Sequence, residues 1–396
     1  MVSREIVKDV FWVGALDFDR RLFDELIPLP EGTSYNSYLI RGSEKIALID
    51  TVDPMKEEEL IVNLIKLGIQ QIDYIIINHA EQDHAGSLPM MLEMYPRAKV
   101  VTNEKCRDLL IALLQIPAES VMVIKDGDTL SLGNKTLKFL LTPWTHWPET
   151  QLTFLVEDRI LFPCDLFGFH QATSELYITN EAEAYRSAKR YFAEIMMPFR
   201  NSIKGYIQKV RDLNPIMIAP SHGPINKNPK FMLDAYEDWV SDTVKNVVVL
   251  PYVSMHGSTQ VMVDHLVGAL IQRGVEVRPF NLSHTDIGEL AYALVDAATV
   301  VVGTPTVLFG PHPQVVYATY LANALKPKVR FASVIGSYGW GGKAAETIVK
   351  MLDHVKVEVI EPVVIKGLPD EAAVVAINRL ADDIAKKHKE IGILYQ

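Results

Sequence analysis

The chain has 396 residues and a formal net charge of −10 at pH 7, which predicts two or three domains and disfavours nucleic acid as a partner. Hydrophobic residues make up 48% of the chain and charged residues 22%, which excludes a largely disordered or collagen-like chain. The two cysteines, Cys106 and Cys164, are too few for a disulfide framework or a cysteine-ligated iron–sulfur cluster. No signal peptide and no apolar run of membrane-spanning length is visible, so we expect a cytoplasmic protein without a membrane anchor.

The two halves of the chain differ in the order of their predicted strands and helices. Residues 1–245 mix strands, loops and helices, whereas residues 246–396 alternate five strands with five helices. We therefore expect two domains, 1–245 and 246–396, which pack together because no Gly/Ser linker separates them. The regular alternation of the second half predicts a doubly wound parallel sheet.

The densest group of possible metal ligands lies in the segment His79-Ala-Glu-Gln-Asp-His84. It follows the apolar run Ile72–Asn78, so we expect it at the carboxyl end of a buried strand, where α/β sheets present their ligands. Imidazoles combined with carboxylates suit iron, zinc or manganese, and two carboxylates without a thiolate favour iron. The alternative for this segment is a polar loop that caps a helix.

Three later segments each add one possible donor: His146, Asp165 and His222. Each alone could be a turn residue, but their repetition at predicted strand ends indicates that they complete the first cluster. The full set is too large for one tetrahedral ion and suits two metals, which a carboxylate such as Asp165 could bridge at about 3.5–4 Å. The set comprises His79, Glu81, Asp83, His84, His146, Asp165 and His222.

The order His-x-Glu-x-Asp-His, followed by His, Asp and His, resembles the metallo-β-lactamase fold. Hydrolases of that superfamily usually carry a second His where this chain has Glu81. The Glu variant, together with Gly-Thr-Ser-Tyr-Asn-Ser-Tyr over residues 32–38 and His146-Trp-Pro, resembles the flavodiiron proteins (A-type flavoproteins). The resemblance covers nearly the whole chain. It implies an α/β protein in which an αββα metallo-β-lactamase-like sandwich is followed by a flavodoxin-like doubly wound parallel sheet.

The resemblance also assigns the ligands, because all seven ligand positions of that family are filled here. It implies that the iron nearer the flavin is held by His79, Glu81, His146 and the bridging Asp165. It implies that the other iron is held by Asp83, His84, His222 and the same Asp165. In some family members water displaces the residue that matches His84. His170 matches a family histidine that is not a ligand, so we expect it beside the metals, where it would assist proton delivery.

In chain order, the second half is expected to form strands over residues 247–253, 275–279, 299–303, 329–335 and 357–365. The first helix is expected to end at Gly274. The later helices are expected over residues 286–295, 315–325, 343–352 and 370–389. Alternation of this kind places the loops that follow the parallel strands at one edge of the sheet.

Three of these loops predict a flavin site. Ser254–Thr259 opens a helix, and its backbone N–H groups and hydroxyls could bind a phosphate, although an ordinary helix cap is the alternative. It lacks the lysine of a Walker A sequence and the G-x-G-x-x-G of a dinucleotide site. Gly303–Thr306 and Gly336–Gly342 carry glycines that would let a flat ring approach the backbone. The residues expected to bind FMN are Ser254, Met255, His256, Gly257, Ser258, Thr259, Thr304, Pro305, Thr306, Ser337, Tyr338, Gly339, Trp340 and Gly341.

The resemblance implies an oxidoreductase that reduces dioxygen to water, nitric oxide to nitrous oxide, or both, with FMN and two iron ions per chain. It implies a head-to-tail homodimer or a dimer of dimers, in which the FMN of one subunit serves the irons of another. Electrons would come from a separate donor, such as rubredoxin or a reduced deazaflavin. The sequence does not rank dioxygen against nitric oxide.

Two other functions stay open. A zinc hydrolase of the metallo-β-lactamase type with an appended flavodoxin domain would bind zinc and cleave thioesters or related bonds, but Glu81 and the second half of the chain argue against it. A flavin electron carrier whose first half binds a structural metal is the third possibility. Structural zinc sites are usually closed and rich in thiolates, which does not suit this donor set.

Overall fold

The computed structural model describes residues 3–352 and 356–395. The chain divides into two compact units: Met1–Phe192 with Phe199–Val240, and Ala193–Pro198 with Ser241–Gln396. The boundary between residues 245 and 246 stays a prediction; the first strand of the second unit, β17, covers Lys245–Tyr252. Among the described residues, no helix has both the length and the apolar character needed to cross a membrane.

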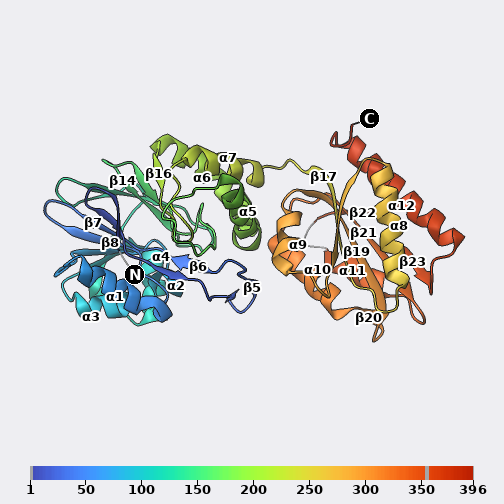
Figure 1. Ribbon diagram of the computed structural model, residues 1–396, viewed down its shortest axis with the longest axis horizontal. Helices are drawn as coiled ribbons and strands as arrows, with labels where there is room; N and C mark the ends of the chain where they lie inside the picture. The colour runs from blue at the N-terminus through green and yellow to red at the C-terminus, as the bar shows by residue number, and fades with distance from the viewer. Residues whose placement is uncertain (1–2, 353–355, 396) are drawn as a thin grey trace. The chain divides into compact units, whose positions relative to one another are not determined.

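The first unit contains two large β-sheets (Figure 1). The larger has the order β1-β2-β7-β8-β9-β10-β11, with bounds Arg4–Val7, Val10–Trp12, Tyr38–Arg41, Ile46–Ile49, Tyr74–Ile76, Lys99–Asn103 and Val121–Ile124. The smaller has the order β12-β13-β14-β15-β16, with bounds Thr129–Ser131, Thr136–Leu141, Gln151–Leu155, Ile160–Phe162 and Met217–Ile218. Two short antiparallel pairs join β3 (Ala15–Asp17) to β6 (Thr33–Tyr35) and β4 (Leu22–Phe23) to β5 (Ile27–Pro28).

Alternating side chains of the larger sheet build two cores, because successive residues of a strand point to opposite faces. Leu48 and Ile75 belong to the core shared with the helices on the outer face. Ala47 and Ile76 belong to the core between the two sheets, where Phe162 of the smaller sheet also lies. The outer helices are α1 (Glu57–Lys66), α3 (Leu88–Met94) and α4 (Glu104–Leu114).

Three further helices complete the αββα layers beside the smaller sheet (Figure 1). They are α5 (Glu181–Tyr191), α6 (Arg200–Leu213) and α7 (Pro229–Val240). The Tyr206 hydroxyl of α6 donates to the Pro143 carbonyl at 3.2 Å, and the Phe167 N–H donates to the Tyr236 hydroxyl of α7 at 3.2 Å. These bonds tie the helices to the loops that follow β13 and β15.

The second unit contains one sheet in the order β18-β17-β19-β21-β22, with β23 also pairing with β21, and all of these pairs are parallel. Besides β17, its strands are β18 (Glu276–Asn281), β19 (Ala297–Val307), β21 (Phe331–Tyr338), β22 (Glu358–Val359) and β23 (Val363–Lys366). One core lies under α9 (Ile287–Leu294), α10 (Pro313–Leu325) and α11 (Ala344–Met351). The other lies under α8 (Ser258–Gln272) and α12 (Glu371–Glu390). This is the flavodoxin-like order, so the predicted doubly wound sheet is confirmed.

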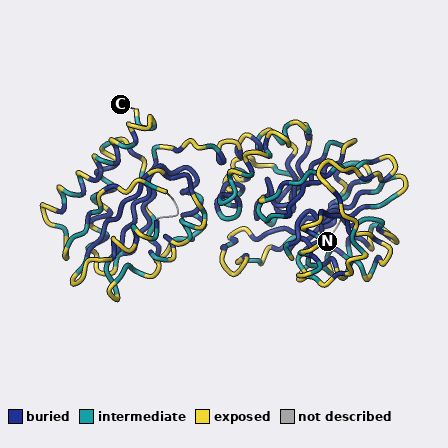
Figure 2. The backbone as a smooth tube through the Cα atoms, turned by 180° about the vertical axis from the view of Figure 1, so that it is seen from behind, coloured by how far each residue is buried: buried dark blue, intermediate teal, exposed yellow. Residues whose placement is uncertain are grey.

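In both units the strands form the buried centre and the turns between them are exposed, as Figure 2 shows. The strand bounds differ from the sequence prediction by one to four residues, and two differences have a clear physical reason. The third strand of the second unit continues to Val307, because its end pairs with β20 (Gly310–Pro311). The fifth strand, predicted over 357–365, consists of β22 and β23, separated by residues 360–362. Pro362 in that gap lacks the N–H that a continuous ladder needs.

A buried histidine ties α12 to the sheet of the second unit. His388 has no exposed surface, and its Nδ1 donates to Asn246 Oδ1 at 2.8 Å. The amide orientation follows from Asn246 Nδ2, which donates to the Gly274 carbonyl at 2.8 Å. His388 Nε2 therefore accepts from Thr299 Oγ1 at 2.7 Å. Burial lowers the pKa of His388 to about 4.

Acid should destabilise the second unit through His388. The folded-state pKa lies below the unfolded value of about 6.5, so the stabilisation is complete above that pH and is lost as the pH falls toward 4. The loss is at most about 1.4 kcal/mol for each pH unit. We expect denaturant unfolding, followed by circular dichroism between pH 7 and 5, to depend more steeply on pH in the wild type than in His388→Gln. Equal pH dependence of the two proteins would contradict this assignment.

Candidate metal centre

Four segments that follow strands of the two sheets converge on one site. His79 lies three residues beyond β9, and His146 lies in the loop between β13 and β14. Asp165 follows β15 and His222 follows β16. The sequence prediction treated residues 79–84 as a loop, but a short helix, α2 (Gln82–Ala85), begins inside the motif. Asp83 and His84 lie on that helix, whereas His79 and Glu81 precede it.

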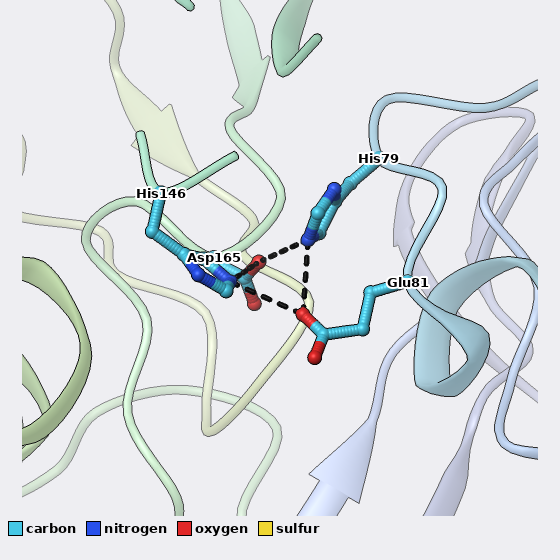
Figure 3. Close-up of side chains that lie close together, drawn as sticks. All are labelled: His79, Glu81, His146 and Asp165. Atoms are coloured by element: carbon cyan, nitrogen blue, oxygen red, sulfur yellow. Dashed lines mark hydrogen bonds and ion pairs between the residues drawn. The ribbon is translucent and has the colours of Figure 1, made fainter. Parts of the chain in front are cut away.

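The first donor group consists of His79, Glu81, His146 and Asp165, whose ligand atoms all lie within 4.8 Å of one another (Figure 3). Glu81 Oε2 lies 3.0 Å from His79 Nε2 and 3.1 Å from His146 Nε2. Asp165 Oδ2 lies 3.7 Å from His79 Nε2 and 3.5 Å from His146 Nε2. Two imidazoles and two carboxylates therefore face a common centre.

The second donor group consists of Asp83, His84 and His222, also within 4.8 Å of one another. Asp83 lies 3.3 Å from His84 Nε2 through Oδ1 and 3.1 Å from His222 Nε2 through Oδ2. Asp165 Oδ1 lies 3.0 Å from His84 Nε2 and 3.3 Å from His222 Nε2. The two oxygens of Asp165 thus face different groups, which is the arrangement that a bridging carboxylate needs.

The carboxylates give the centre a negative electrostatic potential that favours bound positive charge. Burial alone lowers the pKa of His222, but its ion pairs with Asp165 and Asp83 outweigh burial and raise that pKa to about 10. Burial likewise lowers the pKa of His146, but bonds to Asp165 and Glu81 raise it to about 9. Burial raises the pKa of Asp165, yet the surrounding imidazoles, His84 first, hold it well below its usual range. A centre of this kind takes up cations, whether protons or metal ions.

Unpartnered oxygens support the fit of a metal to these residues. Both carboxylate oxygens of Asp83, and Oδ2 of Asp165, are buried without a hydrogen-bond partner among residues 3–352 and 356–395. A buried oxygen left in that state is costly unless a cation faces it. Imidazole and carboxylate donors without thiolate suit iron. The thiol of Cys164 also lies near His84 and Asp165, but burial raises its pKa well above its usual value, which makes it a poor ligand.

Several contacts at the centre have no signal in the sequence. Tyr191 of α5 donates its hydroxyl to Asp165 Oδ1 at 2.9 Å, and Glu149 lies 2.7 Å from His79 Nδ1. Thr33 Oγ1 lies 2.8 Å from His170 Nδ1. The ring centroid of His170 lies 4.7 Å from that of His222, and His170 belongs to neither donor group. Its role beside the metals stays a prediction.

The three predicted flavin segments lie at the carboxyl ends of β17, β19 and β21, which are neighbours in the sheet. The prediction of loops was wrong for two of them, because Gly303–Thr306 belongs to β19 and residues 336–338 belong to β21. Gly257, at a φ of 89°, immediately precedes α8, and the Gln260 N–H donates to Ser254 Oγ at 3.1 Å. Trp340 is 63% exposed and contacts Phe309, with ring centroids 4.8 Å apart. A Cβ at Gly303 would lie 2.6 Å from the Cβ of Tyr252. Packing of β19 against β17 therefore already requires a glycine at position 303. The role in flavin approach that the sequence predicts for this glycine stays a prediction.

Comparisons with known proteins cover both units. Residues 33–223 match the family model described as ODP family beta lactamase, and residues 250–376 match the model described as Flavodoxin. The chain is 35% identical over 363 residues to a nitric oxide reductase of Moorella thermoacetica, which covers 90% of this chain and 90% of that protein.

Solved structures give the same result. Rubredoxin oxygen:oxidoreductase from Desulfovibrio gigas has a TM-score of 0.95 at 28% identity and covers 98% of this chain and 99% of its own. The flavodiiron protein from Giardia intestinalis has a TM-score of 0.92 at 27% identity, with 98% and 97% covered. Together with the αββα unit, the flavodoxin-like sheet and the paired donor groups, these matches place the chain in the flavodiiron protein family.

Proposed function

We propose that this chain is an oxidoreductase that reduces dioxygen to water, nitric oxide to nitrous oxide, or both, at a diiron centre supplied with electrons by FMN. The observation that carries the proposal is the pair of donor groups that share Asp165. Two ferrous ions and one fully reduced FMN would together hold the four electrons that dioxygen needs. The names of the Moorella thermoacetica and Desulfovibrio gigas relatives support nitric oxide and dioxygen as substrates.

We assign one iron to each donor group. The first iron would be held by His79, Glu81, His146 and Asp165. The second would be held by Asp83, His84, His222 and the same Asp165. His84 is the ligand that water displaces in some relatives, and its Nε2 here faces both Asp83 and Asp165.

The first donor group is the more accessible of the two. The side chains of His146 and Glu81 are 14% and 16% exposed, whereas those of Asp83, His84 and His222 are at most 5% exposed. A small gas would therefore reach the first group more directly. This partial opening also argues against a purely structural metal, because structural sites are closed.

Two side chains of this chain would support the reaction without ligating metal. The Tyr191 hydroxyl donates to Asp165 Oδ1 and so fixes the orientation of the bridging carboxylate. Burial lowers the pKa of His170 well below its usual value, so the ring stays neutral. Its Nε2 has no hydrogen-bond partner in the described part of the chain and would hydrogen-bond a water or substrate molecule in the site.

The remaining parts of the proposal concern cofactor, partners and location. FMN would bind the loops after β17, β19 and β21, with its phosphate at the amino end of α8. Electrons would come from a separate donor, rubredoxin or a reduced deazaflavin, and rubredoxin appears in the name of the Desulfovibrio gigas relative. A head-to-tail homodimer or dimer of dimers follows from the family resemblance and stays a prediction, as does the cytoplasmic location expected from the few cysteines.

Replacement of the bridging carboxylate is the direct test of the centre. We expect Asp165→Ala to lower anaerobic nitric oxide turnover and dioxygen turnover at least 100-fold, because both metals lose a ligand, while FMN stays bound. Both gases are assayed in parallel with reduced rubredoxin and with a reduced deazaflavin. Asp108→Ala on α4, where the carboxylate is 64% exposed, is the matched control and should keep full turnover. Retained turnover in Asp165→Ala, or thioester hydrolysis that requires zinc, would contradict the proposal.

A charge placed at the amino end of α8 tests the flavin site. Ser258 is the first residue of this helix, and Ser258→Asp would repel the FMN phosphate there. We expect FMN affinity, measured by flavin fluorescence, to fall at least 10-fold while iron content stays unchanged. Gln272→Glu adds the same charge at the other end of α8 and should bind FMN normally. Equal affinity of the two variants would place the phosphate elsewhere.

A further inference from the structure

Glu149 is a buried carboxylate that lies behind one of the proposed metal ligands. Its Oε1 lies 2.7 Å from His79 Nδ1, and the Ala80 N–H donates to the same oxygen at 3.1 Å. Neither the Glu149 nor the His79 side chain has exposed surface. An ionised carboxylate only accepts hydrogen bonds, so the proton of His79 resides on Nδ1. Nε2, the nitrogen that faces Glu81 and Asp165, is left with its lone pair free for a metal.

The backbone around Glu149 is fixed from a neighbouring strand. Asn103, the last residue of β10, donates through Nδ2 to the Glu149 carbonyl at 2.6 Å and to Gln151 Oε1 at 3.0 Å. The Cys106 N–H donates to Asn103 Oδ1 at 3.1 Å, so the same side chain also caps α4. Asn103, at the junction of β10 and α4, thus fixes the backbone of Glu149. A carboxylate that orients the ring of His79 needs a fixed backbone of this kind.

In the second donor group, His222 has a neutral partner behind its ring instead of a carboxylate. His222 Nδ1 donates to the backbone carbonyl of Ser34 at 2.7 Å, and the Thr33 hydroxyl is 3.5 Å away. Both of these partners are neutral. A carboxylate behind a metal-bound imidazole increases the basicity of the ring more than a carbonyl does. The two donor groups are therefore unequal in the electron density that their histidines offer.

The charges of the two groups differ in the same sense. Each group has one carboxylate of its own, Glu81 or Asp83, and both share Asp165. Glu149 adds a further negative charge directly behind His79 of the first group.

We propose that Glu149 is a positioning residue that makes the two metal positions unequal. Acting through His79, it strengthens metal binding in the first donor group and makes the iron there the first of the pair to be oxidised. The inference rests on the diiron centre proposed above. Glu149 ligates neither metal in this assignment, so its effect passes through the tautomer, orientation and basicity of one imidazole.

The test compares variants of the full-length, flavin-loaded protein containing ⁵⁷Fe. Glu149→Gln keeps the size and an oxygen that can accept from Nδ1 but removes the charge. We expect one of the two irons to be released to a chelator with an affinity loss of about 10–100-fold, the usual size of such an effect. Both proteins are then titrated with ferricyanide, which accepts one electron per ion. In the wild type the first ferric signal in the Mössbauer spectrum should come from one iron site, whereas in Glu149→Gln it should come from both sites. Glu149→Asp, which keeps the charge at a longer reach, should fall between the wild type and Glu149→Gln.

Asp73→Asn is the matched control. The Asp73 side chain is 12% exposed and accepts from the Ile46 backbone N–H at 2.9 Å and from Lys45 Nζ at 3.1 Å, so this variant removes a mostly buried charge whose partners lie outside the metal centre. It should leave iron retention and the order of oxidation unchanged. The inference is overturned if Glu149→Gln behaves as the wild type, if it weakens both irons equally, or if Asp73→Asn gives the same change.

Unfolding of Glu149→Gln and a low iron content of the wild type would each have a distinct meaning. If circular dichroism finds Glu149→Gln unfolded, Glu149→Asp decides: a smaller loss confined to one iron supports the inference, and an unchanged protein overturns it. If the wild type itself holds fewer than two irons, the proposed diiron function fails, and the failure does not lie with Glu149. The two claims are therefore separated by the wild-type iron content.

Discussion

Burial of several carboxylates in one small site is the constraint on which the first unit depends. The side chains of Asp83, Asp165 and Glu149 are at most 5% exposed, and a buried charge without a partner costs several kcal/mol. The fold tolerates these groups because each faces an imidazole and because strand ends of two sheets bring the imidazoles to them. The same negative charge that destabilises the folded unit without metal would attract metal cations to the site. Metal binding and folding of this unit are therefore expected to be coupled.

The centre is asymmetric in access as well as in charge. His146 and Glu81 open the first donor group to solvent, while the second group is closed. Glu149 places its charge behind the open side, next to His79. Under the proposals made above, the position that a gas would reach first is also the one with the stronger donor set. In the other unit, three neighbouring strands end at the segments proposed for FMN, so storage of electrons and binding of the gas would be divided between separate sheets.

Much of this arrangement could be predicted from the sequence because a physical rule governs it. Strands with apolar residues end in polar side chains, and parallel strands end at a common edge; this rule accounts for Asp165 and His222, which follow the parallel pair β15 and β16. His79 follows β9 of the other sheet and meets them because the two sheets pack face to face. Glu149 and Tyr191 could not be predicted, since each contacts a residue far along the chain and neither belongs to a repeating pattern. The continuation of β19 to Val307 was also missed, because it depends on pairing with β20 and not on local propensity.

The metal content of the wild-type protein tests the central claim most directly. Protein grown with ample ferrous salt, and with equal zinc in a parallel culture, is analysed by inductively coupled plasma mass spectrometry and Mössbauer spectroscopy. The shared carboxylate of Asp165 predicts two irons per chain with magnetic coupling between them. One isolated metal per chain, two uncoupled irons, or a preference for zinc under both conditions would contradict the account.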